Sequence, residues 1–553
     1  MHRLTGRLTV CMVVFLTVFL SRTQALAVTA EEEAERVEQL SAMEPTQREE
    51  IAVQPLIEIE KTWEIEDTHT AAASQLVTSV SFCRGETGHD RESHTFYASL
   101  GTGLTQWPEL EMTASGAEGL RVAWVDDYAW DDPKDAVRQG TAYQLIAWTD
   151  TEYEYLKVIF TGLPVMSIRT YAETEPSDSY EPAYVSLASA DFDAVSSIAR
   201  IHTRGGGYKV LAKQSYRIEF AGKKKQKYGY KKKKVSLLGM PEDTDWVLLA
   251  NGTDETHLRN MVGFRLWKGM NADTTAFGLL EGCLVEVCLN DEYLGIYNLQ
   301  QRVKPVRELE QAGCSAADVS VRVVKTYSIE DRPAKDTSGF LNGGWLELRY
   351  QPQGKTVEEC FALYDDYLKL WDSGTDSETF ISLAEEHLDI GALMRYFVYF
   401  QAAVLNTDNI GNNTYIWAVR KGGKLLYYLS PWDLDNAFST EDLEEKELNE
   451  KMKMPIRVLD LDVPGAREAL WKEWNRLRSG LLSDESIAGY AEMLQEEMNS
   501  TGAWRRDAEK WDTENGELDL TVEQNDLTEH LKRMEQAMLL RWPQEEAEGT
   551  ESR

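Results

Sequence analysis

Cysteine is scarce in this sequence. Only six of the 553 residues are cysteine, and their spacings match no metal-binding motif. Cys283 and Cys288 lie five positions apart on one expected strand, so their side chains point to opposite faces and do not readily pair. A disulfide framework therefore does not organise the fold, and at most one bridge is expected.

Basic residues are also scarce. The chain has 58 Lys and Arg against 93 Asp and Glu, which gives a formal net charge of −35. A field this negative repels nucleic acid phosphates and anionic lipid surfaces, which excludes nucleic acid as a partner. The exception is a basic run, Lys223–Lys227 and Lys231–Lys234, between two expected strands. Two readings of this run stay open: a solvated hairpin loop, or a docking surface for acidic substrates or for the protein's own acidic segments.

Long apolar runs are limited to Leu8–Leu20, which Arg3 and Arg7 precede and Ala25-Leu26-Ala27 follows. As a helix this run rises only about 20 Å, short of a bilayer core of roughly 30 Å. Residues 1–27 are therefore expected to be a bacterial signal peptide. We expect a secreted or cell-surface protein with no membrane span after signal cleavage.

Several common catalytic motifs are missing. The sequence has no His-Glu-x-x-His zinc motif and no Gly-x-Ser-x-Gly elbow. Gly354-Lys355-Thr356 lacks the first glycine of a P-loop, where Arg349 stands, and the glycine pair that begins at Gly101 does not continue as a dinucleotide fingerprint. Zinc peptidase, α/β-hydrolase, P-loop and dinucleotide-binding sites of these types are excluded.

The chain is long enough for two or three domains of an α+β protein. Residues 28–70 are Glu-rich and predict an acidic tether or loose helix, and residues 75–172 show short strands typical of a small β-sandwich-like module. Residues 183–445 mix strands and helices, and residues 446–545 have the charged pattern of a helical appendage. The aromatic residues of the N-terminal module indicate core packing, with binding of carbohydrate or cell-wall polymer as the open alternative.

Residues 406–438 hold the most informative pattern. An apolar helix is expected to end just before Asp408, and Asn413 follows five residues later. Two strands are then expected on either side of Gly422-Gly423, a strong hairpin signal, and the second strand ends at Asp433. Because a hairpin brings its two ends together, we expect these polar residues to converge.

This order suits phosphoryl transfer, which needs a carboxylate near the attacking hydroxyl and oxygen ligands for a divalent metal. Protein kinases use an Asp, an Asn five residues later, and a second Asp farther along. The alternative is that these residues only end a helix and a strand through local hydrogen bonds. Glycoside hydrolysis is less favoured, because Asp433 and Asp435 lie two residues apart on an extended segment, which suits metal binding better than an acid–base pair.

Several ordered blocks between about residues 198 and 440 resemble the CotH family, spore coat protein H and its relatives, which are atypical protein kinases. The blocks are Arg204–Gly207, Ala212–Phe220, Leu238–Ala250, Asp254–Asn260, Asn290–Tyr297 and Asn406–Asp435. The resemblance implies an atypical protein-kinase-like core that uses ATP with Mg²⁺ or Mn²⁺. It also implies Ser/Thr acceptors on exported or surface proteins, and leaves cell-wall or spore-coat association open.

The resemblance further implies roles for single residues. Asp408 is expected as the catalytic base, Asn413 and Asp433 as metal ligands, and Asp435 as an additional metal carboxylate. Lys213 is expected to contact the nucleotide phosphates.

Arg204 and Arg259 belong to the same blocks and are grouped with the nucleotide-binding residues, although a buried ion pair is an equally open reading of Arg259. The family usually has a Glu where this chain has Gln300-Gln301. If that Glu pairs with the lysine, a neutral Gln301 weakens the pair. The second hypothesis is therefore a catalytically weak CotH-like surface or spore-coat protein that works by binding.

Overall fold

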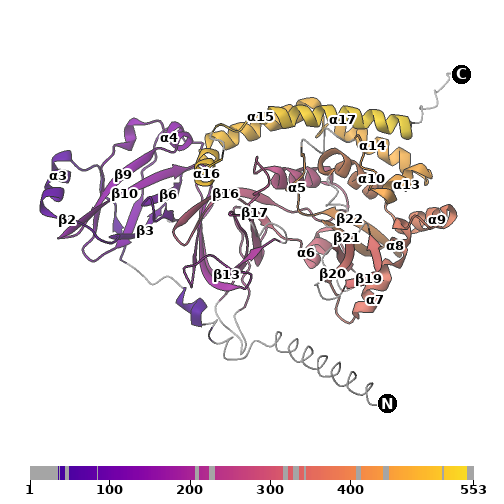
Figure 1. Cartoon of the computed structure of the whole chain (residues 1–553), viewed down its shortest axis with the longest axis horizontal. Coiled ribbons are helices and arrows are strands. Elements are labelled where there is room, and N and C mark those ends of the chain that lie inside the picture. The colour runs from indigo at the N-terminus through magenta and orange to yellow at the C-terminus, as the bar shows by residue number, and fades with distance from the viewer. Residues whose placement is uncertain are drawn as a thin grey trace, which may run out of the picture.

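The computed structural model describes most of the chain and confirms a mixed α and β protein (Figure 1). The described residues are 35, 38–43, 49–83, 85–205, 211–222, 231–314, 322–327, 335–341, 344–405, 413–439, 447–513 and 516–544. Figure 1 shows the N-terminal sheets at one end, a barrel in the middle and a helix-covered sheet at the other end.

Two sheets form the N-terminal module. One has the order β1-β7-β3-β4, made of β1 (Ile51–Ala52), β7 (Met112–Gly116), β3 (Val77–Phe82) and β4 (Gly85–Glu86). The other has the order β5-β6-β10-β9-β8, made of β5 (Gly88–Asp90), β6 (Thr95–Ser99), β10 (Glu152–Thr161), β9 (Ala142–Trp148) and β8 (Arg121–Trp124), with β2 (Thr70–Ala71) paired to β10. Both sheets contribute to one apolar core, which holds Phe82, Phe96, Trp124 and Phe160. Short helices α3 (Ile59–Thr68), η1 (Tyr128–Trp130) and α4 (Pro133–Gln139) complete the module.

Part of the expected acidic tether belongs to this module. Ile51 of β1 lies opposite Ala114 of β7, and Ile65 of α3 is buried against Ile146 and Trp148. Residues 49–70 are therefore not a tether. The segment is rich in glutamate overall, but the isoleucines spaced among the glutamates form an apolar face that packs on the module.

A closed barrel follows, in the order β11-β12-β13-β14-β15-β17-β16. Its strands are β11 (Val165–Thr170), β12 (Glu181–Ala188), β13 (Val195–Arg204), β14 (Ser215–Phe220), β15 (Asp245–Leu249), β16 (Gly282–Leu289) and β17 (Glu292–Gln301). The parallel pair β11 and β16 closes the barrel, with Val165 opposite Glu286. The strand Val165–Thr170, grouped by sequence with the N-terminal module, therefore belongs to the barrel, because its partners come later in the chain.

The remaining sheet has the order β19-β20-β18-β21-β22, from β18 (Arg322–Tyr327), β19 (Lys335–Leu341), β20 (Gly344–Tyr350), β21 (Thr414–Lys421) and β22 (Lys424–Pro431). The helices before β21 are α5 (Arg259–Met270), α6 (Pro305–Gln311), α7 (Val357–Phe361), η3 (Ala362–Tyr364), α8 (Asp365–Trp371), α9 (Ser377–His387), α10 (Ile390–Tyr399) and η4 (Phe400–Val404). The helices after β22 are α13 (Lys453–Asp460), α14 (Ala466–Arg478), α15 (Asp484–Ser500), α16 (Ala503–Trp511) and α17 (Thr521–Arg541).

The C-terminal helices share the core of this sheet. Trp417 of β21, Tyr399 of α10, Trp474 of α14 and Met534 of α17 belong to one buried cluster. Figure 1 shows α15 and α17 running along the molecule above both the barrel and the sheet. The helical region is therefore packed into the body of the protein and is not a separate appendage.

Two further expectations concern cysteines and membrane spans. Within the described residues, Cys83, Cys283, Cys288, Cys314 and Cys360 are all free. In the same part of the chain, no helix has the length and apolar character needed to cross a membrane.

Candidate active site

The hairpin predicted around Gly422-Gly423 is confirmed. Both glycines have positive φ (58° and 82°), and β21 pairs with β22 so that Thr414 lies opposite Pro431. The amide N–H of Trp432 donates to the carbonyl oxygen of Asn413 over 2.8 Å. Asn413 and the segment that carries Asp433 therefore meet at one end of the hairpin.

The chain enters this region through an unusual helix end. After α10, the Phe400–Val404 segment widens into a π-helical turn, and the amide of Leu405 donates to the carbonyl of Phe400 over 2.9 Å. Such turns are rare and occur often at functional sites. Asp408, the expected catalytic base, follows directly and lies outside the described residues.

Buried amides and a histidine fix this π-helical turn. Gln401 accepts from the amide of Asn449 over 2.7 Å and donates to its carbonyl over 3.2 Å. The Asn449 side chain donates to the carbonyl of Leu405, and His530 of α17 contacts the carbonyl of Gln401 over 2.8 Å. Helix α17 thus supports the entry to the candidate catalytic loop.

The segment after β22 is held by the first turn of α5 and, through it, by the loop that leads into this helix. The amide of Leu434 donates to the side-chain oxygen of Asn260 over 2.9 Å, and Asn260 donates in turn to Asn251 over 3.2 Å. A side chain on Gly263 would meet the Leu434 side chain at 2.8 Å, so this glycine permits the close approach. Two blocks far apart in sequence therefore form one structural unit.

Asp254 organises the same loop from within. It is only 1% exposed and accepts hydrogen bonds from Thr256 and from the backbone amide of Arg259. The Arg259 guanidinium Nε lies 3.4 Å from the Asp254 carboxylate. The structure thus displays the ion-pair reading of Arg259, and its side chain is mostly buried.

Three carboxylates gather where these segments meet: Asp254, Asp433 and Asp435. Asp433 adopts a positive φ of 59°, and Thr253 donates to Asp435 over 3.4 Å. Burial, together with the charges of Asp433 and Asp254, raises the pKa of Asp435 to about 7. Crowded carboxylates of this kind suit a divalent cation, and oxygen donors are the set that Mg²⁺ and Mn²⁺ prefer. No cluster of three or more acidic, His or Cys side chains at metal-binding distances occurs in the described part of the chain, which does not include Asp408.

Lys213 lies at the edge of the barrel and is 8% exposed. Its Nζ donates to Asp507 Oδ1 of α16 over 2.5 Å, and His257 Nε2 lies 3.0 Å from the other oxygen of Asp507. Burial lowers the pKa of Lys213, and the charge of Asp507 offsets part of that shift. Burial alone would raise the pKa of Asp507, but its contacts with His257 and Lys213 hold it below the ordinary value.

The position of Asp507 also explains why residue 295, in the sequence block Asn290–Tyr297, is glycine. The amide of Ile296 donates to Asp507 Oδ1 over 2.7 Å, and a Cβ on Gly295 would lie 2.0 Å from the same oxygen. Gly295 has a φ of 80° as well. Both the backbone conformation and the approach of the carboxylate therefore require glycine at this position.

The glutamines that replace the family Glu are buried elsewhere. Gln301 accepts from the amide of Glu281 over 3.3 Å and donates to the carbonyl of Pro241 over 3.2 Å. Gln300 accepts from the side chain of Asn298. The carboxylate that contacts Lys213 is Asp507, which sequence reasoning missed because it lies 294 residues away.

Arg204 connects the barrel to the hairpin. Its guanidinium lies over the ring of Trp432, 5.5 Å from the centroid. Because Trp432 directly precedes Asp433, this contact joins Arg204 to the segment that carries Asp433 and Asp435.

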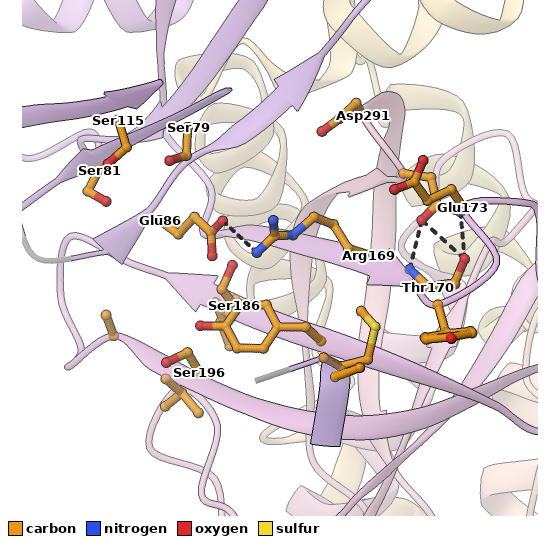
Figure 2. A pocket seen from close by; sticks show the side chains of 18 of the residues that line it. Ser79, Ser81, Glu86, Ser115, Arg169, Thr170, Glu173, Ser186, Ser196 and Asp291 are labelled. Carbon is orange, nitrogen blue, oxygen red and sulfur yellow. Dashed lines mark hydrogen bonds and ion pairs between the residues drawn. The ribbon is translucent and has the colours of Figure 1, made fainter. Parts of the chain in front are cut away.

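A separate cleft of about 570 Å³ lies between the N-terminal module and the barrel (Figure 2). Figure 2 shows serines from several strands around the Arg169–Glu86 ion pair, which measures 3.3 Å. The lining contains none of the expected catalytic residues. The aromatic residues of the N-terminal module are not part of this lining, so the cleft adds no support to the carbohydrate-binding alternative.

Comparison with known proteins identifies the family of this chain. The family model described as CotH kinase protein matches residues 201–538, which is more than half of the chain. No curated protein matches this chain. The match extends into α17, so the C-terminal helices fall within the family's region, in line with their contacts to Lys213 and to the π-helical turn. The chain belongs to the CotH kinase protein family.

Proposed function

We propose that this protein is an exported atypical protein kinase that transfers the γ-phosphoryl group of ATP to Ser or Thr of exported or surface proteins. The observation that carries the proposal is the meeting of Asn413, Asp433 and Asp435 beside the loop that holds Asp254. The family supports the kinase class. Export rests on the signal peptide pattern of residues 1–27, which lie outside the described residues.

Asn413, Asp433 and Asp435 are the residues that would hold Mg²⁺ or Mn²⁺. When bound, the ion neutralises phosphate charge and orients the phosphates of ATP. The carboxylate crowding around Asp435 supports this role, because a buried carboxyl beside two others is stabilised by a cation. Asn260 positions the segment through its hydrogen bond to Leu434.

We assign to Asp408 the role of the base that accepts the proton of the acceptor hydroxyl. As that hydroxyl oxygen forms its bond to the γ-phosphorus, the bond to the β,γ-bridging oxygen breaks and ADP leaves. The hydroxyl proton passes to a carboxylate oxygen of Asp408. The π-helical turn and its contacts with Asn449 and His530 support the backbone that leads to this residue.

Lys213 is assigned to the nucleotide phosphates, with Asp507 as its orienting partner. Protein kinases use a Lys–Glu pair in which the carboxylate fixes the ammonium for phosphate contact. The Lys213–Asp507 pair has the same chemistry, so Gln301 by itself is not an argument against activity.

The alternative is a catalytically weak CotH-like protein that acts at the cell wall or spore coat by binding. One observation favours the enzyme. The chain has Asn413, Asp433 and Lys213 together, and the lysine has a carboxylate partner. A binding protein has no need of buried charges that cost desolvation energy.

The direct test is label transfer from γ-labelled ATP with Mn²⁺ or Mg²⁺ to the protein itself and to a generic acceptor protein. Asp408→Asn and Asp433→Asn keep the side-chain shape, and Asn also tolerates the positive φ of position 433. Exposed Asp273→Asn serves as the matched control. We expect label with the wild type and the control and loss of at least about a hundredfold in both variants. Absence of transfer and of metal-dependent ATP binding in the wild type would favour the binding protein.

A further inference from the structure

One histidine lies between the lysine proposed to bind phosphate and the segment proposed to bind metal. His257 belongs to the loop that leads into α5, and its side chain is 13% exposed. Its ring packs against Trp504 of α16, with 5.6 Å between the ring centroids. The reaction proposed above gives this histidine no role, although it has contacts on both sides.

On one side, His257 contacts the carboxylate of Asp507. The ammonium of Lys213 and the amide of Ile296 donate to Asp507 Oδ1 over 2.5 and 2.7 Å, and His257 Nε2 lies 3.0 Å from Oδ2. Burial opposes ionisation of Asp507, but the contacts with His257 and Lys213 lower its pKa. The carboxylate is therefore ionised and accepts only, so each neighbour approaches it as a donor.

The contact with His257 fixes the rotation of this carboxylate. The last torsion of an aspartate side chain has broad minima, so a carboxylate that is held at one oxygen still turns about its Cβ–Cγ bond. A contact at the second oxygen defines the plane of the group. Since Lys213 and Ile296 donate to Oδ1, the contact of His257 with Oδ2 decides how Oδ1 is presented to the ammonium.

On the other side, the backbone of His257 leads toward the metal-binding segment. Asn251 donates to the carbonyl oxygen of His257 over 2.9 Å and accepts from the side chain of Asn260 over 3.2 Å. Asn260 accepts in turn from the amide of Leu434, which lies inside the proposed metal-binding segment. A continuous series of hydrogen bonds and ion contacts thus joins this segment, through His257, to Lys213.

The side chains of this series are buried. Asn251, Asn260 and Asp507 are 6%, 2% and 3% exposed, and Lys213 is 8% exposed. Water therefore has little access to replace a contact that is lost. Because a buried polar group without its partner is costly, a change at His257 acts on its neighbours and is not absorbed by solvent.

The backbone of His257 offers a simpler role that a test must separate from this one. Its φ is 58°, in the left-handed region, where His, Asn and Asp are more frequent than other residues with a side chain. A residue that only permits this turn needs no ring. The ring nitrogen Nδ1 is buried without a hydrogen-bond partner in the described part of the chain, so Asp507 is the polar group that orients the ring.

We propose that His257 is a positioning residue of the active site, whose ring holds Asp507 in the orientation that directs Lys213 at the nucleotide phosphates. Its backbone connects this pair to the segment that carries the metal carboxylates. The inference rests on the proposed kinase function, in which Lys213 binds phosphate. His257 acts through Asp507 and transfers no proton, so loss of its ring should appear in the affinity for ATP.

Two substitutions separate the ring from the turn. His257→Gln places an amide N–H as many bonds from Cα as Nε2 of histidine, so it can reach Asp507, but Gln is less suited to a positive φ. His257→Asn suits the positive φ but ends one bond short of Asp507. His257→Gly also suits the turn and repeats the loss of the ring. The matched control is the same pair, Gln and Asn, at exposed Glu173, which has a φ of 51° between β11 and β12.

Calorimetry with Mn²⁺ measures ATP binding by the mature protein, label transfer gives KM and kcat, and thermal melting reports folding. We expect His257→Asn and His257→Gly to raise Kd and KM for ATP by about tenfold or more, with kcat changed by less than about threefold. His257→Gln should stay within about threefold of the wild type in ATP affinity, although it should melt no higher than His257→Asn. The Glu173 variants should leave the ATP constants unchanged.

The two roles of His257 therefore predict different orders of the variants. Equal ATP affinity of His257→Asn and His257→Gln would overturn the proposal and leave His257 as a turn residue. A fall in kcat at constant KM in His257→Asn would overturn it as well, because the ring would then act on the chemical step and not through Lys213.

Calorimetry also separates this inference from the proposed function, because it detects ATP binding without transfer. Label transfer by the wild type, with ATP constants that His257→Asn leaves unchanged, would remove the inference and leave the kinase. ATP binding that depends on the ring, without any label transfer, would remove the kinase and leave His257 as part of a nucleotide site. A wild type that binds no ATP would overturn both.

Discussion

The ammonium of Lys213 and the carboxylate of Asp507 lie 2.5 Å apart, although 294 residues separate them in the sequence. One belongs to the connection between two barrel strands and the other to α16, a helix near the C-terminus. The contact makes the C-terminal helices part of the candidate active site, because they supply the charge that holds the lysine proposed to bind phosphate.

Asp507→Asn is expected to reduce label transfer by about tenfold to a hundredfold and to destabilise the fold by about 3 kcal/mol, because it leaves Lys213 buried without a countercharge. Urea unfolding and initial transfer rates measure the two effects. Exposed Asp512→Asn, at the end of the same helix, should change neither.

A double-mutant cycle with Lys213→Met tests whether the pair acts as one unit. Coupling predicts that Lys213→Met combined with Asp507→Asn is more stable than Asp507→Asn alone, since the uncompensated ammonium is gone. Additive losses would show that the two residues contribute independently.

Gly295→Ala is expected to disrupt the same contact from the other side. The new methyl group would lie 2.0 Å from Asp507 Oδ1 and would also sit at a φ of 80°, so we expect destabilisation of more than about 3 kcal/mol. Gly313→Ala separates the two causes, because Gly313 has a φ of 72° but no atom within 4 Å of the added carbon. Gly313→Ala should cost only about 1 kcal/mol by chemical denaturation. Equal losses would attribute the effect to backbone strain alone.

The sequence predicts the local parts of this site well. Gly422-Gly423 sets the hairpin, and the hairpin places Asn413 beside Trp432 through one backbone hydrogen bond. Strands such as Ser215–Phe220 were also recognisable, because alternating apolar residues reveal a half-buried strand.

Contacts between distant segments were not predictable in the same way. Nothing around Asp507 marks it as the partner of Lys213, since its surroundings have an ordinary charged helical pattern. The Val165–Thr170 strand has no local signal for its partner Glu286 to Leu289. Periodicity reveals which face of a segment is buried, while its partner is decided by packing across the whole fold.

Asp435→Asn is expected to stabilise the metal-free protein at pH 8. The pKa of Asp435 is raised to about 7 in the folded state, by burial and by Asp433 and Asp254, from an ordinary value near 3.8. The folded state therefore holds a proton that the unfolded chain has released, so this group costs stability as the pH rises from about 4 to above 7.

The variant has no carboxyl to ionise and should gain on the order of 1–3 kcal/mol over the wild type at pH 8 in EDTA, with a smaller difference at pH 5. Thermal melting at both pH values measures this. Adding Mn²⁺ should raise the melting temperature of the wild type more than that of Asp435→Asn. A variant less stable than the wild type at pH 8 would contradict the crowding of charges at this site.

Arg506 provides the last prediction, because it fastens α16 to the barrel independently of Lys213. Its guanidinium forms two hydrogen bonds with Glu286, at 2.9 and 2.7 Å, and Tyr293 donates to the same carboxylate over 2.6 Å. All three side chains are buried, so Arg506→Met leaves Glu286 charged in an apolar setting and should cost about 3–5 kcal/mol.

Arg505→Met, on the neighbouring and more exposed position, is the matched control and should cost less than about 0.5 kcal/mol. If α16 positions Asp507, loosening it should also reduce label transfer under conditions where Arg506→Met remains folded, and should raise the KM for ATP more than it lowers kcat. Unchanged ATP kinetics in the folded variant would mean that Asp507 stays against Lys213 without this anchor. The role of α16 would then be confined to stability.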